Sequence, residues 1–325
     1  MASPFSKLEV DEALRPKARA FSFDLDEHLS SVMVLTSKVA DDAFTARTLG
    51  TLRLGNAVVI SPGGLVLTIG YLVTEAEAVT LTANDGRQTQ AHVLGVDAAS
   101  GFALVQALEP LDLPALRIGD SRRLREGRPV ISAGGGGRAH ASAGELLARS
   151  PFAGYWEYCL DEALFVEPAH PHWSGAALIG PSGELMGVGS LRMERRTARG
   201  DISPLNMFVP AELLPPILDD LAGGRPAGPA RPWLGVLAQE NESRIVILDA
   251  SPGGPASRAE LRRGDVIRKI AGQPVTDLAG FYKRLWALGS PGVTAPLTLQ
   301  RGGETFDVEI RTADRAALLK KRRLN

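Results

Sequence analysis

The sequence contains a single cysteine, Cys159, among its 325 residues, which excludes an internal disulfide and a zinc site built from several cysteines. Long apolar runs are also missing. The longest, Leu65–Val73, includes glycine, threonine and tyrosine and is far shorter than the roughly 20 residues that span a bilayer. Histidine is scarce as well, so any histidine-based acid–base chemistry near neutral pH must use one of five residues. These are His28, His92, His140, His170 and His172.

Neither sign of charge dominates, because 36 lysine and arginine residues are matched by 37 aspartate and glutamate residues, giving a net charge of −1. This balance argues against nucleic-acid binding by the chain as a whole and against polybasic membrane attachment. Hydrophobic residues at 44% and charged residues at 22% are typical of an ordered globular protein. The first residues show no basic start followed by an apolar stretch. We therefore expect a cytoplasmic protein, and a periplasmic one only if the start is truncated.

The length suggests two domains, at about 150 residues per domain. Short β-branched runs separated by turn residues fill the first part of the chain and predict an antiparallel barrel or sandwich. A helix is predicted over residues 210–221, where leucine and isoleucine recur at helical spacing. The predicted strands are residues 31–36, 56–61, 65–70, 78–83, 90–96, 102–108 and 129–134.

Residues 222–231, AGGRPAGPAR, lack an apolar pattern and are the best linker in the chain. Before the linker we place an N-terminal extension over 1–27 and a first domain over 28–221. After it we place a second domain over 232–315 and a basic tail over 316–325. The second domain is expected to contain strands at 234–237, 245–248 and 265–270, helices at 256–261 and 277–288, and a closing hairpin.

Several segments occur in the order and with the spacing of the HtrA family, in which a trypsin-like serine protease domain precedes a PDZ domain. They include NAVVISPGGLVLTIGYLV (56–73), DGRQTQAHVLGVDAASGFALVQ (85–106), HPHWSGAALIGPSGELMGVGSL (170–191) and SPGGPASRAELRRGDVIRKIAGQPVTDLAGF (251–281). The resemblance runs from about residue 31 to residue 312. It implies a mainly β protein, with a trypsin-like double antiparallel β-barrel followed by an α+β PDZ domain.

The resemblance also carries the family's catalytic residues onto positions of this sequence. The histidine falls on Tyr71, the aspartate on Gly101, and the serine is kept as Ser174. A glycine of the oxyanion loop, two residues before the serine, falls on His172. A phenol with a pKa near 10 is a poor base at pH 7, and glycine has no carboxylate. We therefore expect an inactive protease in which Ser174 is a remnant nucleophile; the alternative is a serine endopeptidase with an unorthodox site on Ser174.

Other reactive side chains have simpler interpretations. His170 and His172 have a spacing that metal ligands could use, but no third ligand is evident, so we expect no metal and two loop histidines in solvent. Asp97 is expected to cap a turn, and Cys159 to be a buried strand cysteine. The glycine run 134–137 lacks the following lysine of a phosphate-binding loop. No cofactor is implied.

The PDZ-like segment keeps the features that peptide recognition by strand addition needs: an edge strand, a neighbouring helix and N–H groups for a terminal carboxylate. Unfolded polypeptides or C-terminal segments are the expected partners, bound by a scaffold, regulator or holdase. The same apolar residues could instead only fill the core of a small domain, in a purely structural protein. The expected N–H donors are Leu234, Gly235 and Val236, and the expected pocket residues are Ile245, Phe281 and Leu285.

The resemblance further implies a homotrimer formed through the N-terminal segment. Phe21, Phe23 and Leu25 alternate there and could make that contact. Packing of these side chains onto the chain's own barrel is the open alternative.

Overall fold

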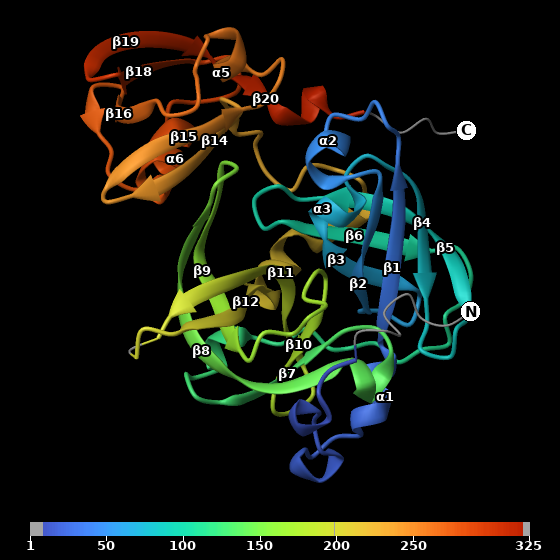
Figure 1. Ribbon diagram of the computed structural model, residues 1–325. Coiled ribbons are helices and arrows are strands. Elements are labelled where there is room, and N and C mark those ends of the chain that lie inside the picture. The colour runs from blue at the N-terminus through green and yellow to red at the C-terminus, as the bar shows by residue number, and fades with distance from the viewer. Residues whose placement is uncertain (1–8, 198, 321–325) are drawn as a thin grey trace. The chain divides into compact units, whose positions relative to one another are not determined.

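Two closed antiparallel barrels and a separate sheet contain most of the strands (Figure 1). A computed structural model describes residues 9–197 and 199–320. The described residues form two compact units. One unit contains the residues up to Ser150 and Glu162–Ala227, and the other contains Pro151–Asp161 and Gly228–Lys320. The expected boundaries assigned residues 151–161 to the first domain, whereas the structure groups this segment with the second unit.

The first barrel has the strand order β1-β2-β3-β6-β5-β4. Its inward positions are filled by fully buried β-branched and leucine side chains, which is why the β-branched runs of the sequence predict it well. Its strands are β1 (Val32–Val39), β2 (Leu52–Val59), β3 (Leu65–Ile69), β4 (Ala76–Thr82), β5 (Gln88–Val96) and β6 (Phe102–Ala107). The short helices before and between these strands are α1 (Leu25–Ser30), α2 (Ala46–Leu49) and α3 (Gly70–Val73), and the 3₁₀ turns η1 (Glu12–Leu14) and η2 (Ala18–Ala20) precede them in the chain.

The second barrel has the strand order β10-β11-β12-β9-β8-β7. Its strands are β7 (Pro129–Ala133), β8 (Ala141–Gly154), β9 (Tyr158–Glu167), β10 (Ala177–Ile179), β11 (Leu185–Arg196) and β12 (Ile202–Pro210). The 3₁₀ turns η3 (Ser121–Arg123) and η4 (Gly137–His140) also belong to this region. The fold-class prediction for this part of the chain, a trypsin-like double β-barrel, is confirmed.

The helix predicted over 210–221 is wrong in its first two thirds. The segment forms two 3₁₀ turns, η5 (Ala211–Leu213) and η6 (Pro215–Ile217), and only then a short α-helix, α4 (Leu218–Ala222). Two consecutive prolines explain the difference, because Pro215 and Pro216 have no N–H to donate and their rings clash with the preceding turn. The leucine spacing alone did not reveal this break.

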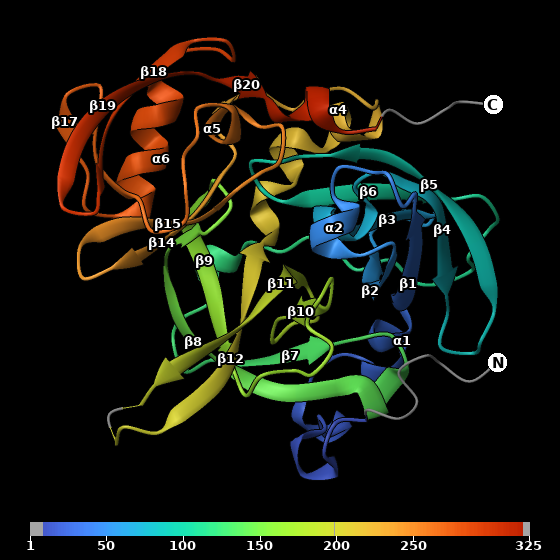
Figure 2. The same ribbon diagram turned by 45° about the horizontal axis from the view of Figure 1, so that its top comes forward.

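The second unit is built on a sheet with the order β14-β15-β16-β18-β19. The helix α6 packs on β14 and β16 (Figure 2), and it closely matches the helix predicted over 277–288. Asp277 caps it by accepting the N–H of Gly280 at 2.7 Å. The elements are β13 (Pro232–Trp233), β14 (Val236–Asn241), β15 (Arg244–Ala250), α5 (Pro255–Arg258), β16 (Val266–Ile270), β17 (Gln273–Pro274), α6 (Leu278–Ala287), β18 (Thr294–Arg301), β19 (Glu304–Arg311), β20 (Ala313–Asp314) and η7 (Arg315–Leu318).

The alternating N-terminal segment packs onto its own barrel. Leu25 begins α1 and is 1% exposed. The rings of Phe21 and Phe23 lie 5.3 Å apart, and Phe23 lies 4.4 Å from the ring of His28. A side chain at Gly183 would collide with Phe23 and His28, so these rings sit against the turn before β11. The predicted homotrimer stays a prediction.

Candidate functional site

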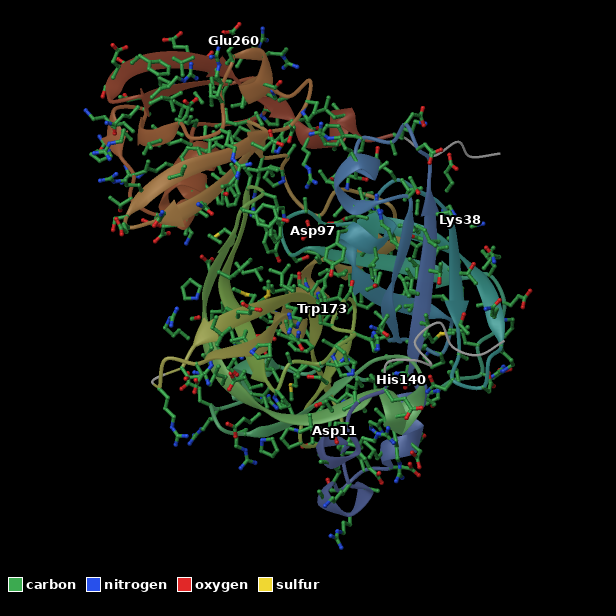
Figure 3. All side chains as sticks on the ribbon, in the orientation of Figure 1. Asp11, Lys38, Asp97, His140, Trp173 and Glu260 are labelled. Carbon is green, nitrogen blue, oxygen red and sulfur yellow. The ribbon has the colours of Figure 1, made fainter. Side chains whose placement is uncertain are left out.

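Ser174 lies in the loop before β10, and a residue of the other barrel holds that loop in place. The backbone N–H and the side-chain amide of Asn56, on β2, both donate to the carbonyl of Ser174, at 2.8 and 3.0 Å. The same side-chain amide donates to the carbonyl of His172 at 2.8 Å. Asn56 is fully buried. The loop carrying the serine is therefore fixed by hydrogen bonds to backbone atoms, an arrangement that no sequence motif had indicated. Figure 3 labels Trp173, the residue directly before the serine.

Tyr71 contacts Ser174 directly. Its hydroxyl oxygen lies 2.8 Å from Ser174 Oγ and 2.7 Å from the backbone carbonyl of Ser190. A carbonyl can only accept, so the single phenol proton is donated to Ser190. The bond to the serine must then run the other way, with Ser174 Oγ donating its proton toward the phenol oxygen. Burial raises the pKa of Tyr71 above its ordinary value of 10, despite the bond to Ser174. The phenol is therefore neutral at physiological pH.

A buried arginine fixes the short helix that carries Tyr71. Arg53 is 4% exposed, and its Nη1 donates to the carbonyls of Tyr71 and Thr74 at 2.7 and 2.9 Å. Its Nη2 donates to Thr45 Oγ1 at 2.7 Å, and the same hydroxyl donates to Glu75 at 2.6 Å. These bonds satisfy carbonyls at the end of α3, which is too short to satisfy them itself. Tyr71 is thus held in one place relative to Ser174.

Gly101 lies next to the Tyr71 helix but offers only backbone atoms. Its carbonyl accepts the N–H of Gly70 at 2.6 Å. Its φ of +83° lies in the left-handed region, which glycine adopts without strain. Asp97 caps this turn by accepting the N–H of Ser100 at 2.7 Å, as the sequence predicts. No carboxylate therefore stands at position 101.

The histidines before Ser174 are buried, so the expectation of two solvent-exposed loop histidines is wrong. His170 is 0% exposed and His172 is 8% exposed. The N–H of His172 donates to Nδ1 of His170 at 3.1 Å, and Nε2 of His170 pairs with the carbonyl of His140 at 2.9 Å. Because Nδ1 accepts, the ring proton is on Nε2. Burial lowers the pKa of His170 to about 4, which keeps the ring neutral.

This use of both ring nitrogens leaves His170 without a nitrogen to bind a metal ion. Among residues 9–197 and 199–320 there is no group of three or more histidine, cysteine, aspartate or glutamate residues able to hold a metal ion. The His-Pro-His sequence has a structural role instead: it fixes the backbone that leads to the serine.

The N–H groups predicted to bind a terminal carboxylate already bind a side-chain carboxylate in the second unit. Glu157, in the turn between β8 and β9, accepts the N–H of Gly235 at 2.6 Å and that of Val236 at 3.0 Å through Oε1. Its Oε2 accepts the N–H of Leu234 at 3.1 Å. Gly235 has a φ of +80°, and a side chain there would collide with Trp233, so this position of the loop favours glycine.

The predicted pocket residues lie in the core of the second unit. Ile245, Phe281 and Leu285 are all 0% exposed and belong to one hydrophobic cluster with Leu234. Cys159 belongs to the same cluster, as its predicted burial requires, and burial raises the pKa of its thiol. Tyr282 was not among the residues predicted from the sequence, and its hydroxyl donates to the carbonyl of Gly154 at 2.8 Å. Its place directly after Phe281 on a predicted helix was the signal that could have identified it.

Comparison with known proteins matches both parts of the chain. Residues 55–188 match the trypsin-like peptidase domain, and residues 232–312 match the PDZ domain. The chain belongs to the HtrA family. A probable periplasmic serine endoprotease DegP-like of Halomonas elongata is 27% identical over 277 residues, covering 80% of this chain and 56% of the relative. The periplasmic pH-dependent serine endoprotease DegQ of Escherichia coli is 26% identical over 276 residues, covering 79% of this chain and 58% of the relative.

Solved HtrA structures share the fold. The HtrA-type protease AlgW with decapeptide has a TM-score of 0.53 and 20% identity, covering 90% of this chain and 97% of that one. The serine endoprotease from Yersinia pestis has a TM-score of 0.51 and 23% identity, covering 91% and 96%. The present HtrA-family chain spans about half the length of the curated relatives it matches.

The comparison corrects the expected location. The curated relatives are named periplasmic endoproteases, which contradicts the cytoplasmic assignment and points to the periplasm. The cytoplasmic assignment rested only on the composition of the first residues, and the names of the relatives overturn it. Within the described part of the chain, no helix has the length and apolar character needed to cross a membrane.

Proposed function

We propose that this HtrA-family chain is proteolytically inactive and binds polypeptide segments through its PDZ domain. The observation that carries the first half is the bond between Tyr71 and Ser174, in which the serine donates to a phenol oxygen whose own proton is held by Ser190. Tyr71 takes the place of the family's catalytic histidine, Gly101 that of the aspartate, and Ser174 is a remnant nucleophile. The proposed domains are 28–221 for the protease fold and 232–315 for the PDZ domain, joined by the linker 222–231.

The chemistry of the site supports inactivity at each step. To activate Ser174, a base must take its proton and hold it as a cation, as imidazole does. A neutral phenol oxygen cannot do this, and burial raises the pKa of Tyr71, so the tyrosinate form is even rarer than in water. With Gly101 there is no carboxylate to stabilise a cation beside it. Loss of a single triad member lowers kcat by roughly 10⁴- to 10⁶-fold in well-studied serine proteases.

The backbone at the proposed oxyanion loop supports the same conclusion. A tetrahedral intermediate needs N–H groups pointing at its negatively charged oxygen. The N–H of His172 instead points at Nδ1 of His170. This buried bond would have to break before the N–H of His172 could donate to the oxyanion of a substrate.

Proteolysis is tested by incubating the full chain with unfolded casein and with a fluorophosphonate probe, beside Ser174→Ala. We expect wild type and variant to give the same background cleavage and labelling. The alternative is a serine endopeptidase that acts through Ser174, as the names of the relatives suggest. Cleavage or labelling that disappears in Ser174→Ala would establish that alternative and overturn the proposal of an inactive protease.

The binding half of the proposal rests on the loop Leu234–Val236, whose N–H groups converge on a carboxylate. Backbone N–H groups arranged in this way can capture the carboxylate of a peptide C-terminus. The partners we propose are unfolded polypeptides and free C-termini, held by a scaffold, regulator or holdase.

A further inference from the structure

The peptide site of the second unit consists of the N–H groups of Leu234–Val236, the edge of β14 and the helix α6. The strand β14 is the first in its sheet order, so its outer edge pairs with no other strand of that sheet. Within the same compact unit lies the hairpin tip, Pro151–Asp161, which joins β8 to β9. Figure 1 shows this tip close to β14 and α6.

The hairpin tip contacts every part of the peptide site. The carboxylate of Glu157 accepts all three N–H groups of the loop. Two residues earlier, the carbonyl of Tyr155 accepts the N–H of Ala238, on the edge of β14, at 2.9 Å. One residue before that, the carbonyl of Gly154 accepts the hydroxyl of Tyr282, on α6.

These contacts have the pattern of strand addition, in which backbone bonds to an edge strand accompany capture of a carboxylate. A short extended segment supplies the carbonyl that pairs with the edge, and an acidic group at its end enters the loop. Glu157 also has a φ of +57°, a conformation that costs energy in a residue other than glycine. Three N–H bonds to one carboxylate offset that cost.

Apolar contacts add to the polar ones. Cys159 is 9% exposed and belongs to the core cluster of the second unit, and Ala153 packs against the same cluster. At the end of the tip, Asp161 forms a 2.6 Å ion pair with Lys283 of α6. This pair is exposed, so it contributes little to holding the tip.

We propose that residues Gly154–Glu157 are an internal ligand of the PDZ domain, with the Glu157 carboxylate standing in for the carboxylate of a foreign C-terminus. The inference rests on the proposed peptide-binding function and specifies it. A linear peptide with a free C-terminus binds only after the tip leaves, so its apparent affinity is reduced by the fraction of molecules that are closed. The carbonyl two residues before the carboxylate-bearing residue is the one that pairs with Ala238.

The single cysteine gives a direct measure of closure that needs no ligand. In the full chain, reaction of Cys159 with 4,4′-dithiodipyridine should be slow, because this residue of the tip is buried in the core cluster of the second unit while the tip is docked. Glu157→Ala should speed the reaction at least tenfold. Glu162→Ala, which removes an exposed carboxylate from β9, the strand that carries Cys159, should change the rate less than twofold. Tyr282→Phe, which keeps the ring but removes the bond to Gly154, should speed the reaction independently.

Equal thiol rates in wild type, Glu157→Ala and Tyr282→Phe would overturn the internal ligand. Binding is then measured by fluorescence polarisation with a labelled peptide of residues 150–157, SPFAGYWE, as free acid and as C-terminal amide. We expect the acid to bind Glu157→Ala at least tenfold more tightly than it binds wild type, and the amide to bind weakly to both. Faster thiol reaction in the variants without binding of the acid would uphold the internal ligand and overturn the proposed peptide-binding function.

Discussion

The backbone N–H of His172 donates to Nδ1 of His170 at 3.1 Å, and this bond ties the serine loop to a buried neutral ring. Adding a proton to Nδ1 would replace the acceptor by a donor facing another donor. The ring would also have to carry a charge inside the barrel. Burial is the largest cause of the shift and lowers the pKa of His170 to about 4, although the bond to the carbonyl of His140 opposes it.

The stability of the first unit should therefore fall as the pH is lowered from about 6.5 to about 4. In this window the unfolded chain binds a proton at position 170 and the folded chain does not, so unfolding becomes easier by about 3 kcal/mol in total. The measurement is urea unfolding at half-unit pH steps. In His170→Asn the free energy of unfolding should depend less steeply on pH across this window, because the unfolded variant takes up about one proton fewer. A slope unaffected by His170→Asn would contradict the buried neutral ring.

Tyr71 should matter more for stability than for chemistry. Tyr71→Phe keeps the ring but leaves the carbonyl of Ser190 without its phenol donor and Ser174 Oγ without its acceptor. We expect a loss of about 1–3 kcal/mol in the free energy of unfolding, the usual effect of leaving buried polar groups unpaired. Tyr155→Phe is the matched control, because that tyrosine is 54% exposed. Equal unfolding midpoints for the two variants would show that the Tyr71 bonds do not stabilise the barrel.

Restoring the histidine alone should not restore proteolysis. In Tyr71→His the imidazole would lack a carboxylate to fix its tautomer and stabilise its cation, because position 101 is glycine. Loss of that carboxylate alone costs about 10⁴-fold in kcat. We expect casein cleavage by Tyr71→His to stay at the level of Ser174→Ala. Clear cleavage by the single variant would show that the oxyanion loop is functional and that the tyrosine is the main block.

The strands and the Tyr71–Ser174 pair could be predicted from the sequence because local patterns encode them. Runs of β-branched residues mark all six strands of the first barrel but only β7 of the second. The HtrA-like motifs place Tyr71 and Ser174 in the same site although 103 residues separate them. The burial of His170 could not be predicted in this way, because it depends on which carbonyl its ring meets after folding. The prolines at 215 and 216 carried a helix-breaking signal that the leucine spacing obscured.

The residue that binds the N–H groups of Leu234–Val236 could not be predicted from the sequence, for a different reason. The motif Trp233-Leu234-Gly235-Val236 indicates that a carboxylate binds, but not which one. Glu157 lies 77–79 residues away, in a turn without a recognisable motif. Its selection depends on the length of the β8–β9 hairpin. Every acidic residue in a long surface turn would have been an equal candidate.

Docking of the hairpin tip should weaken as the pH rises. Burial raises the pKa of Glu157 to about 7, although the N–H groups of Leu234–Val236 and the charge of Arg315 oppose this shift. The undocked carboxyl has an ordinary pKa near 4.5. The docked state therefore binds a proton more tightly than the open state, so docking is strongest below about pH 4.5 and weakens until about pH 7.

Tyr282 also interacts with Glu157, and burial raises the pKa of this tyrosine above its ordinary value of 10, so it stays neutral throughout this window. The measurement is the protection of Cys159 against 4,4′-dithiodipyridine, taken as the rate in urea-unfolded chain divided by the rate in folded chain, which removes the thiol's own pH dependence. Wild-type protection should fall at least tenfold between pH 5 and pH 7.5. In Glu157→Gln, which cannot titrate, it should change less than twofold. The same decline in both proteins would mean that Glu157 does not control docking, because a group absent from the variant cannot be its cause.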